Sequence, residues 1–154
     1  MSPTGHKFTA AALACALAWP LFSEQMYLEA AMVAAGVMLG ARAPDWTEFA
    51  RWHNERRYSL IPHRGPTHWP GTWLIGLIAS LVFLEMPYRE PAAGFFAAAL
   101  LHLAMDIMTP TGIPLLHPFA RKVSLNVYRS GAFLSEFALT AICWSGALIV
   151  FASA

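Results

Sequence analysis

The chain has 154 residues, of which 57% are hydrophobic and only 12% are charged, and its formal net charge is +1. A soluble domain has about 25% charged residues, so this composition argues against a water-soluble globule and for helices packed in lipid. The length allows one domain. A nearly neutral chain without a basic stripe gives no reason to expect nucleic acid as a partner.

Five apolar segments follow one another along the chain, at residues 8–22, 26–41, 69–86, 92–108 and 133–154. A helix needs roughly 17–25 residues to cross the hydrocarbon core of a membrane. The last three segments are long enough, whereas the first two are marginal, and a re-entrant hairpin is the alternative for that pair. We therefore predict an all-α membrane protein, a single integral membrane domain over residues 1–154 with about five transmembrane helices. Lys7 precedes the first segment as in a signal peptide, and residues 12–15 (Ala-Leu-Ala-Cys) resemble a lipoprotein cleavage site. The apolar stretch before that site is too short and lacks the expected aliphatic residue, so we expect the segment to be retained.

Two long loops interrupt the apolar segments. The first, at residues 44–68, begins with a stretch at 45–58 that predicts a short interfacial helix, because its aromatic side chains suit the membrane interface. The charges of this stretch, Glu48 among them, resemble a solvated face. Proline and glycine then break helical continuity at residues 62–66. The second loop, at residues 109–130, is also rich in proline, so we expect two irregular loops.

The basic residues are divided unevenly between the two sides of this arrangement. With five crossings, only Arg89 falls on the C-terminal side. The other nine are Lys7, Arg42, Arg51, Arg56, Arg57, Arg64, Arg121, Lys122 and Arg129. The positive-inside rule then places the N-terminus and both long loops in the cytoplasm, on a bacterial-type inner membrane.

The fourth apolar segment contains two ionisable residues, His102 and Asp106, four positions apart. Positions i and i+4 of a helix share one face. Ionisable residues inside a transmembrane helix are costly and usually mark a functional site. The alternative is a hydrogen-bonded pair that only ties helices together.

Further histidine and aspartate residues fall on the same side of the membrane, at a similar depth. Asp45 follows the second apolar segment, His63 and His68 precede the third, and His6 precedes the first. A hydrolytic metal site combines two or more His, Asp or Glu ligands with an open position for water. We therefore predict a cytoplasm-facing site for a divalent metal ion, zinc above all, with manganese or iron as alternatives. Its candidate ligands are Asp45, His63, His68, His102, Asp106 and His6.

Four other polar residues are candidate catalytic groups: Arg64, Thr67, Thr109 and Glu136. Arg64 could bind a phosphate bidentately, or it could be only a positive-inside charge. Thr67 and Thr109 could orient the metal ligands. Glu136 could instead extend to the membrane interface, and the loop histidines could be ordinary surface residues.

The motifs that these residues form resemble the YdjM-like family of inner-membrane proteins, which are inferred to be metal-dependent hydrolases. The similarity runs in order through His6, residues 40–45 (Gly-Ala-Arg-Ala-Pro-Asp), residues 63–68 (His-Arg-Gly-Pro-Thr-His), residues 102–112 (His-Leu-Ala-Met-Asp-Ile-Met-Thr-Pro-Thr-Gly), Gly131 and Glu136. Thr47 stands where the family often has a second Asp, for which Glu48 could substitute, and Trp69 stands where it often has Ser. The resemblance implies hydrolase chemistry and names no substrate.

We expect hydrolysis of a phosphoester or ester of a lipid or another membrane-proximal substrate, with membrane lipid as the partner. The order of the ligands is similar to that in all-helical zinc phospholipases and nucleases, which is an analogy only. A peptidase is less favoured because the chain has no His-Glu-x-x-His motif. The remaining alternative is a non-enzymatic membrane protein, a regulatory partner or a metal-binding or transport protein that uses the same cluster structurally.

Overall fold

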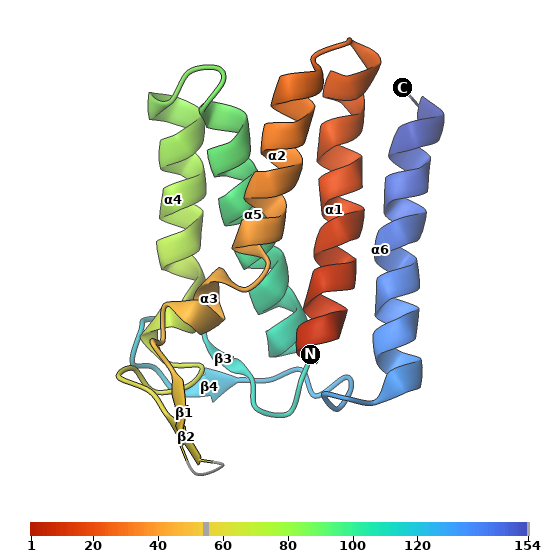
Figure 1. Ribbon diagram of the computed structural model, residues 1–154. Coiled ribbons are helices and arrows are strands. Elements are labelled where there is room, and N and C mark those ends of the chain that lie inside the picture. The colour runs from red at the N-terminus through yellow and green to blue at the C-terminus, as the bar shows by residue number, and fades with distance from the viewer. Residues whose placement is uncertain (54–55, 154) are drawn as a thin grey trace.

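Five long helices form the body of the protein in the computed structural model, which describes residues 1–53 and 56–153. They are α1 (Pro3–Ser23), α2 (Tyr27–Gly40), α4 (Pro70–Phe83), α5 (Arg89–Ile107) and α6 (Phe133–Ser153). The helices alternate in direction, so that the N-terminus and both long loops meet at one end of the bundle (Figure 1). We call this the loop end, and we call the opposite end, where the short connections and the C-terminus lie, the turn end.

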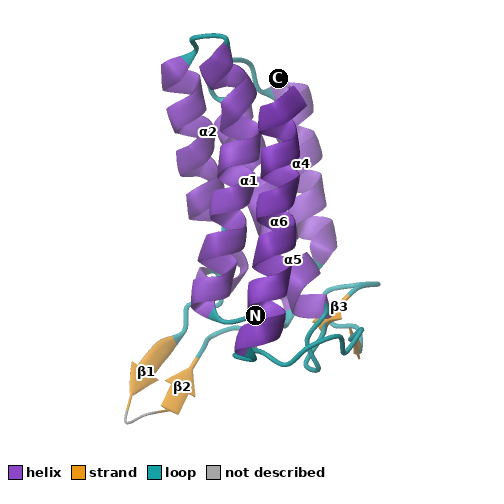
Figure 2. Cartoon of the chain, turned by 90° about the vertical axis from the view of Figure 1, so that its right-hand side faces the viewer, coloured by secondary structure: helices purple, strands orange, loops and turns teal. Residues whose placement is uncertain are grey.

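The shorter elements lie at the loop end of the bundle (Figure 1), and the strands drawn in Figure 2 lie below the helices. They are helix α3 (Ala43–Trp46), the 3-10 helix η1 (Pro66–His68), and two antiparallel ribbons. The first ribbon pairs β1 (Arg51–His53) with β2 (Arg56–Tyr58), and the second pairs β3 (Ile113–Pro114) with β4 (Lys122–Val123). The predicted all-α class is confirmed, because strands take up only these few positions of the described chain.

The expectation of about five transmembrane helices was wrong by the measure of length and composition. Among the described residues, only α5 and α6 are long and apolar enough to cross a membrane. α2 and α4 have 14 residues each, which is about 21 Å of helix against a hydrocarbon core of roughly 30 Å. α1 has 21 residues, but it begins with polar positions such as His6 and Lys7 and is not apolar enough.

The expected interfacial helix at residues 45–58 was also wrong. Helix α3 ends at Trp46, and Phe49 has a positive φ of 51°, which an L-residue adopts reluctantly and a helix does not allow. The chain then turns into the β1–β2 hairpin. Residues 54–55 of the predicted helix lie outside the described residues, as does Ala154 of the last predicted segment.

Close packing of α2 against α5 holds the centre of the bundle. A Cβ atom on Gly36 would collide with the carbonyl oxygen of Pro91, and one on Gly40 would collide with that of Phe95. The two backbones therefore touch at the Gly-x-x-x-Gly pair, as small residues permit in membrane helices. Val37, fully buried, packs against Gly94 of α5 in the same interface.

The outer faces of α4 and α6 are apolar and exposed. Ile75, Val82 and Phe83 of α4 are 63–80% exposed, and Leu134 and Ile142 of α6 are 67–80% exposed. Monomeric soluble proteins rarely expose contiguous apolar patches of this kind. These faces suit contact with lipid chains.

Candidate metal site

Three separate segments bring four potential metal ligands together at the loop end. Asp45 lies in helix α3, which follows the end of α2, and His68 lies in η1. His102 and Asp106 come from the last turns of α5, where both side chains are buried. We call Asp45, His68, His102 and Asp106 the four-ligand group.

The nitrogen and oxygen atoms of this group are spaced as metal ligands are. Nε2 of His68 lies 3.7 Å from Oδ1 of Asp45 and 3.6 Å from Oδ2 of Asp106. Nε2 of His102 lies 3.9 Å from Oδ1 of Asp45 and 3.5 Å from Oδ2 of Asp106. A tetrahedral zinc ion with ligands at about 2.0–2.2 Å separates those ligands by about 3.3–3.6 Å. The observed distances are close to this spacing, and Asp45, His68 and His102 together form a group that could hold a metal ion.

Both of these Nε2 atoms are buried and have no hydrogen-bond partner among the described residues. Each ring is oriented through its other nitrogen: Nδ1 of His102 donates to the carbonyl oxygen of Ala41 over 2.8 Å, and Nδ1 of His68 lies 3.2 Å from Oε1 of Glu48. A proton on Nδ1 leaves a lone pair on Nε2, which is the form that binds a metal. Buried polar atoms are nearly always paired in proteins, so two orphaned nitrogens facing two carboxylates need an explanation such as an ion.

The surroundings of His68 favour this neutral form. Burial, together with the nearby His102, lowers the pKa of His68 to about 4. The imidazole is therefore uncharged at neutral pH, as a metal ligand must be. Thr67 contributes a further contact, since its Oγ1 lies 3.1 Å from Nδ1 of His68.

The second oxygen of Asp106 is held by positively charged and donor groups. Arg64 donates from Nη2 to Oδ1 of Asp106 over 2.8 Å, and the Met1 amino group lies 3.0 Å from the same oxygen. Arg64 also donates from Nη1 to Oγ1 of Thr109 over 2.5 Å, and Thr109 donates in turn to the Asp106 carbonyl. These contacts fix the carboxylate so that Oδ2 faces the two orphaned nitrogens.

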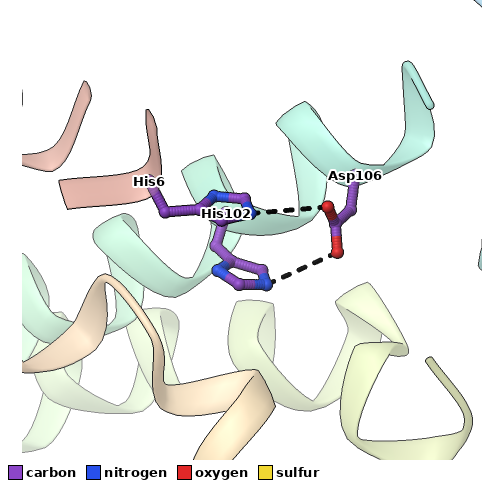
Figure 3. A group of neighbouring side chains, drawn as sticks. All are labelled: His6, His102 and Asp106. Atoms are coloured by element: carbon purple, nitrogen blue, oxygen red, sulfur yellow. Dashed lines mark ion pairs between the residues drawn. The ribbon is translucent and has the colours of Figure 1, made fainter. Parts of the chain in front are cut away.

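His6 joins the same carboxylate from helix α1. Its Nε2 lies 3.5 Å from Oδ1 of Asp106, and its ring stacks on that of His102 with centroids 3.8 Å apart. Figure 3 shows the two rings, each directed at a different oxygen of Asp106. His6, His102 and Asp106 thus form another group that could hold a metal ion.

Glu48 is a site residue that the sequence interpretation missed as such. It is fully buried rather than solvated, and it accepts hydrogen bonds from the Arg64 backbone N–H over 2.9 Å and lies 3.0–3.1 Å from Nδ1 of His63. Burial raises the pKa of Glu48, but the hydrogen bonds from His63 and Arg64 outweigh it and bring the pKa down to about 2. The only feature of the sequence that pointed to Glu48 was its neighbour Thr47. Thr47 stands where the family often has a second Asp, so that Glu48 could substitute for the missing carboxylate.

His63 lies beside the four-ligand group rather than within it. Its side chain is 48% exposed and its Nδ1 faces Glu48. Asp45, Glu48 and His63 are nevertheless close enough to form a further group that could hold a metal ion.

Glu136 lies outside the groups that could hold a metal ion among the described residues. Its carboxylate accepts from the backbone N–H groups of Ser2 and Gly131 over 2.7 and 2.9 Å, and from the Ser2 hydroxyl. The start of α6 is thereby tied to the start of α1. Through these contacts Glu136 holds the N-terminus of the chain in place beside α6.

A cleft of about 630 Å³ opens beside the site. Two carboxylates of the four-ligand group, Asp45 and Asp106, lie in its wall together with Arg64. The rest of the wall is mixed, with basic, aromatic and small side chains: Met1, Pro3, His6, Arg42, Trp46, Phe49, Ala50 and His63. A substrate of moderate size could therefore reach the candidate ligands.

Comparison with known proteins gives one match. The family model described as YdjM inner membrane protein matches residues 1–153, nearly the whole chain. No curated protein and no solved structure matches.

Proposed function

Because the chain belongs to the YdjM inner membrane protein family, as the motifs predicted, we propose that it is a membrane-embedded, metal-dependent hydrolase. Its site lies at the loop end of the bundle, and this end faces the cytoplasm. The proposal rests above all on the four-ligand group. In it, two buried imidazole nitrogens without hydrogen-bond partners among the described residues face two carboxylate oxygens at 3.5–3.9 Å.

The donor set suits zinc, manganese or iron, since it combines imidazole nitrogens with hard carboxylate oxygens. Such an ion, when bound, supplies Lewis acidity that polarises the scissile bond and makes a water molecule acidic. Glu48 and the carbonyl of Ala41 orient the two histidine ligands through Nδ1. Outer contacts of this type are typical of functional metal sites.

The other polar residues have roles that follow from their contacts. Arg64 and Thr109 position Asp106, and Thr67 supports His68. His63 lines the cleft with its Nδ1 held by Glu48, so its other ring nitrogen is the group best placed to transfer a proton to or from the substrate. We assign this role to His63 in preference to that of a ligand.

The reaction is the hydrolysis of a phosphoester or ester. The oxygen of water forms a bond to phosphorus or to the acyl carbon, the ester bond breaks, and the leaving alkoxide takes up a proton to give an alcohol. The substrate is a lipid or another molecule at the membrane, because the cleft lies at the end of an inner-membrane helical bundle.

The membrane orientation is part of the proposal. In this proposal α5 and α6 cross the bilayer, and α1, α2 and α4 are embedded beside them with the same alternation of direction. Nine of the ten Lys and Arg residues lie at the loop end or in its loops, which favours a cytoplasmic position for that end.

The proposal is tested by the metal content of the full-length protein, purified in detergent and measured by elemental mass spectrometry. We expect close to one equivalent of zinc, manganese or iron, lost in His102→Ala and retained in the control His117→Ala, whose histidine is an exposed loop residue. The loaded protein is then tested on phosphate-ester and phospholipid substrates. Protein without metal in every preparation would overturn the proposal, and metal without turnover would favour a structural role.

A further inference from the structure

A second hollow adjoins the cleft and has the opposite character. This groove, of about 580 Å³, is lined by Phe49, Ala50, Arg51, Tyr58, Ser59 and Leu60. Phe49 and Ala50 belong to both hollows, so the groove continues the cleft outward along the first ribbon. Three of its side chains are large and strongly exposed: Phe49 is 66%, Tyr58 is 56% and Leu60 is 84% exposed.

The inner cleft has two arginine side chains, Arg42 and Arg64, in its wall beside the carboxylates of Asp45 and Asp106. Arg64 is 6% exposed, and its Nε has no hydrogen-bond partner within the described part of the chain, although both of its terminal nitrogens are used. Nε of Arg42, on the same cleft wall, is also without a hydrogen-bond partner there and lies 3.9 Å from Oδ2 of Asp45. Buried guanidinium N–H groups without partners favour an anionic ligand group.

We infer that the substrate is an amphiphile, a phosphate ester of a long alkyl or acyl chain, whose phosphate lies in the cleft and whose chain lies along the groove. Two arginine Nε–H groups without hydrogen-bond partners in the described chain, next to the candidate metal ligands, account for the phosphate. The mainly apolar groove that adjoins the cleft accounts for the chain. This inference rests on the proposed function, which it narrows from any membrane-proximal ester to a lipid phosphate ester.

The inference is tested with a series of alkyl phosphates of increasing length. Butyl, hexyl and octyl phosphate are titrated by calorimetry into zinc-loaded, full-length protein in nanodiscs of phosphatidylcholine. We expect the affinity to rise about twofold for each added methylene, and so about 16-fold from butyl to octyl phosphate, because an open groove buries only part of the chain.

Two substitutions in the groove and a matched control test whether the rise in affinity with chain length comes from the groove. The double variant Tyr58→Thr and Leu60→Ser changes two positions that line the groove but not the cleft. It should bind butyl phosphate as the wild type does but lose most of the rise with chain length. Retained zinc shows that the variant is folded. Leu116→Ser removes a leucine of similar exposure, 87% against 84%, from the other loop and should keep the full rise.

The possible outcomes separate this inference from the proposed function. Octyl phosphate that binds no more tightly than butyl phosphate would overturn the inference and leave the hydrolase proposal standing. The same holds if the double variant keeps the full rise, because the chain would then enter the bilayer instead of the groove. If no alkyl phosphate binds to the zinc-loaded wild type, both the inference and the phosphoester substrate of the proposed function are wrong.

Discussion

The two ends of α5 hold their charged side chains in different ways. At the turn end, Arg89 is 43% exposed and pairs with its own neighbour Glu90 over 2.7 Å. At the loop end, Asp106 is 2% exposed and is bound by Arg64, a residue 42 positions earlier in the chain. A local, partly solvated pair needs no other segment, whereas a buried carboxylate is stable only where several segments supply its partners. We therefore expect the functional site at the loop end, where residues far apart in the sequence contact one another.

The largest effect is expected from Asp106→Asn, compared with Glu90→Gln at the other end of the same helix. Asparagine keeps the size of the side chain but loses the charge that a metal and Arg64 both require. Metal affinity should fall by more than the roughly 10–100-fold typical of losing an outer contact. Glu90→Gln should keep its metal. Metal content is measured by elemental mass spectrometry. Equal metal content in the two variants would show that metal binding does not require the Asp106 carboxylate.

His63→Gln separates proton transfer from metal binding. Its side chain faces Glu48 and the cleft, so we expect metal content to stay constant while the turnover of a phosphate-ester substrate falls about 10²–10⁴-fold. Steady-state kinetics with a parallel metal analysis measures both. If metal is lost together with activity, His63 is a ligand, as the sequence interpretation had it.

Glu48→Gln should have a smaller effect. We expect it to weaken metal binding without abolishing it. The amide can no longer act as a charged acceptor for His68, and we expect the metal affinity to fall about 10–100-fold. Competition with a chelator measures this change. Glu85→Gln, at an exposed position of the turn end, is the control and should leave the affinity unchanged.

The smallest effect is expected from the helix packing that positions the site. Gly36→Ala would place a methyl group against the carbonyl oxygen of Pro91, and we expect a loss of about 1–3 kcal/mol in the free energy of unfolding. Gly146→Ala, whose Cβ would meet no atom within 4 Å, should be neutral or slightly stabilising, since alanine favours helix. Denaturation in mixed micelles compares the two. Equal losses would show that close approach of α2 and α5 does not matter.

The sequence predicted the features that depend on local pattern. The apolar segments all form helices, and the positions of His102, Asp106, His68 and Asp45 on one side of the bundle agree with their placement in the chain. Both predictions depend only on residue spacing along a helix and on the alternating direction of successive helices. Neither requires knowledge of side-chain contacts.

Glu48 and the β1–β2 hairpin could not be predicted in this way. Glu48 resembles a solvated charge among other charges, and its burial depends on donors that arrive 15 and 16 residues later, at His63 and Arg64. The hairpin replaces the expected interfacial helix because the positive φ of Phe49, directly after Glu48, ends helical continuity there. Contacts between distant segments overrode the local preference at both places.

The polar face of α5 also has a consequence for how the protein reaches the membrane. The mean hydropathy of α5 is 1.2, against 1.7 for α6. The last turns of α5 carry two ionisable residues, His102 and Asp106, and ionisable residues are costly inside a spanning helix. Partners for this helix are synthesised before it: the glycine face of α2 and the Arg64 guanidinium have already left the ribosome when Asp106 emerges. The order of the segments along the chain thus makes the partners of Asp106 available when α5 is synthesised.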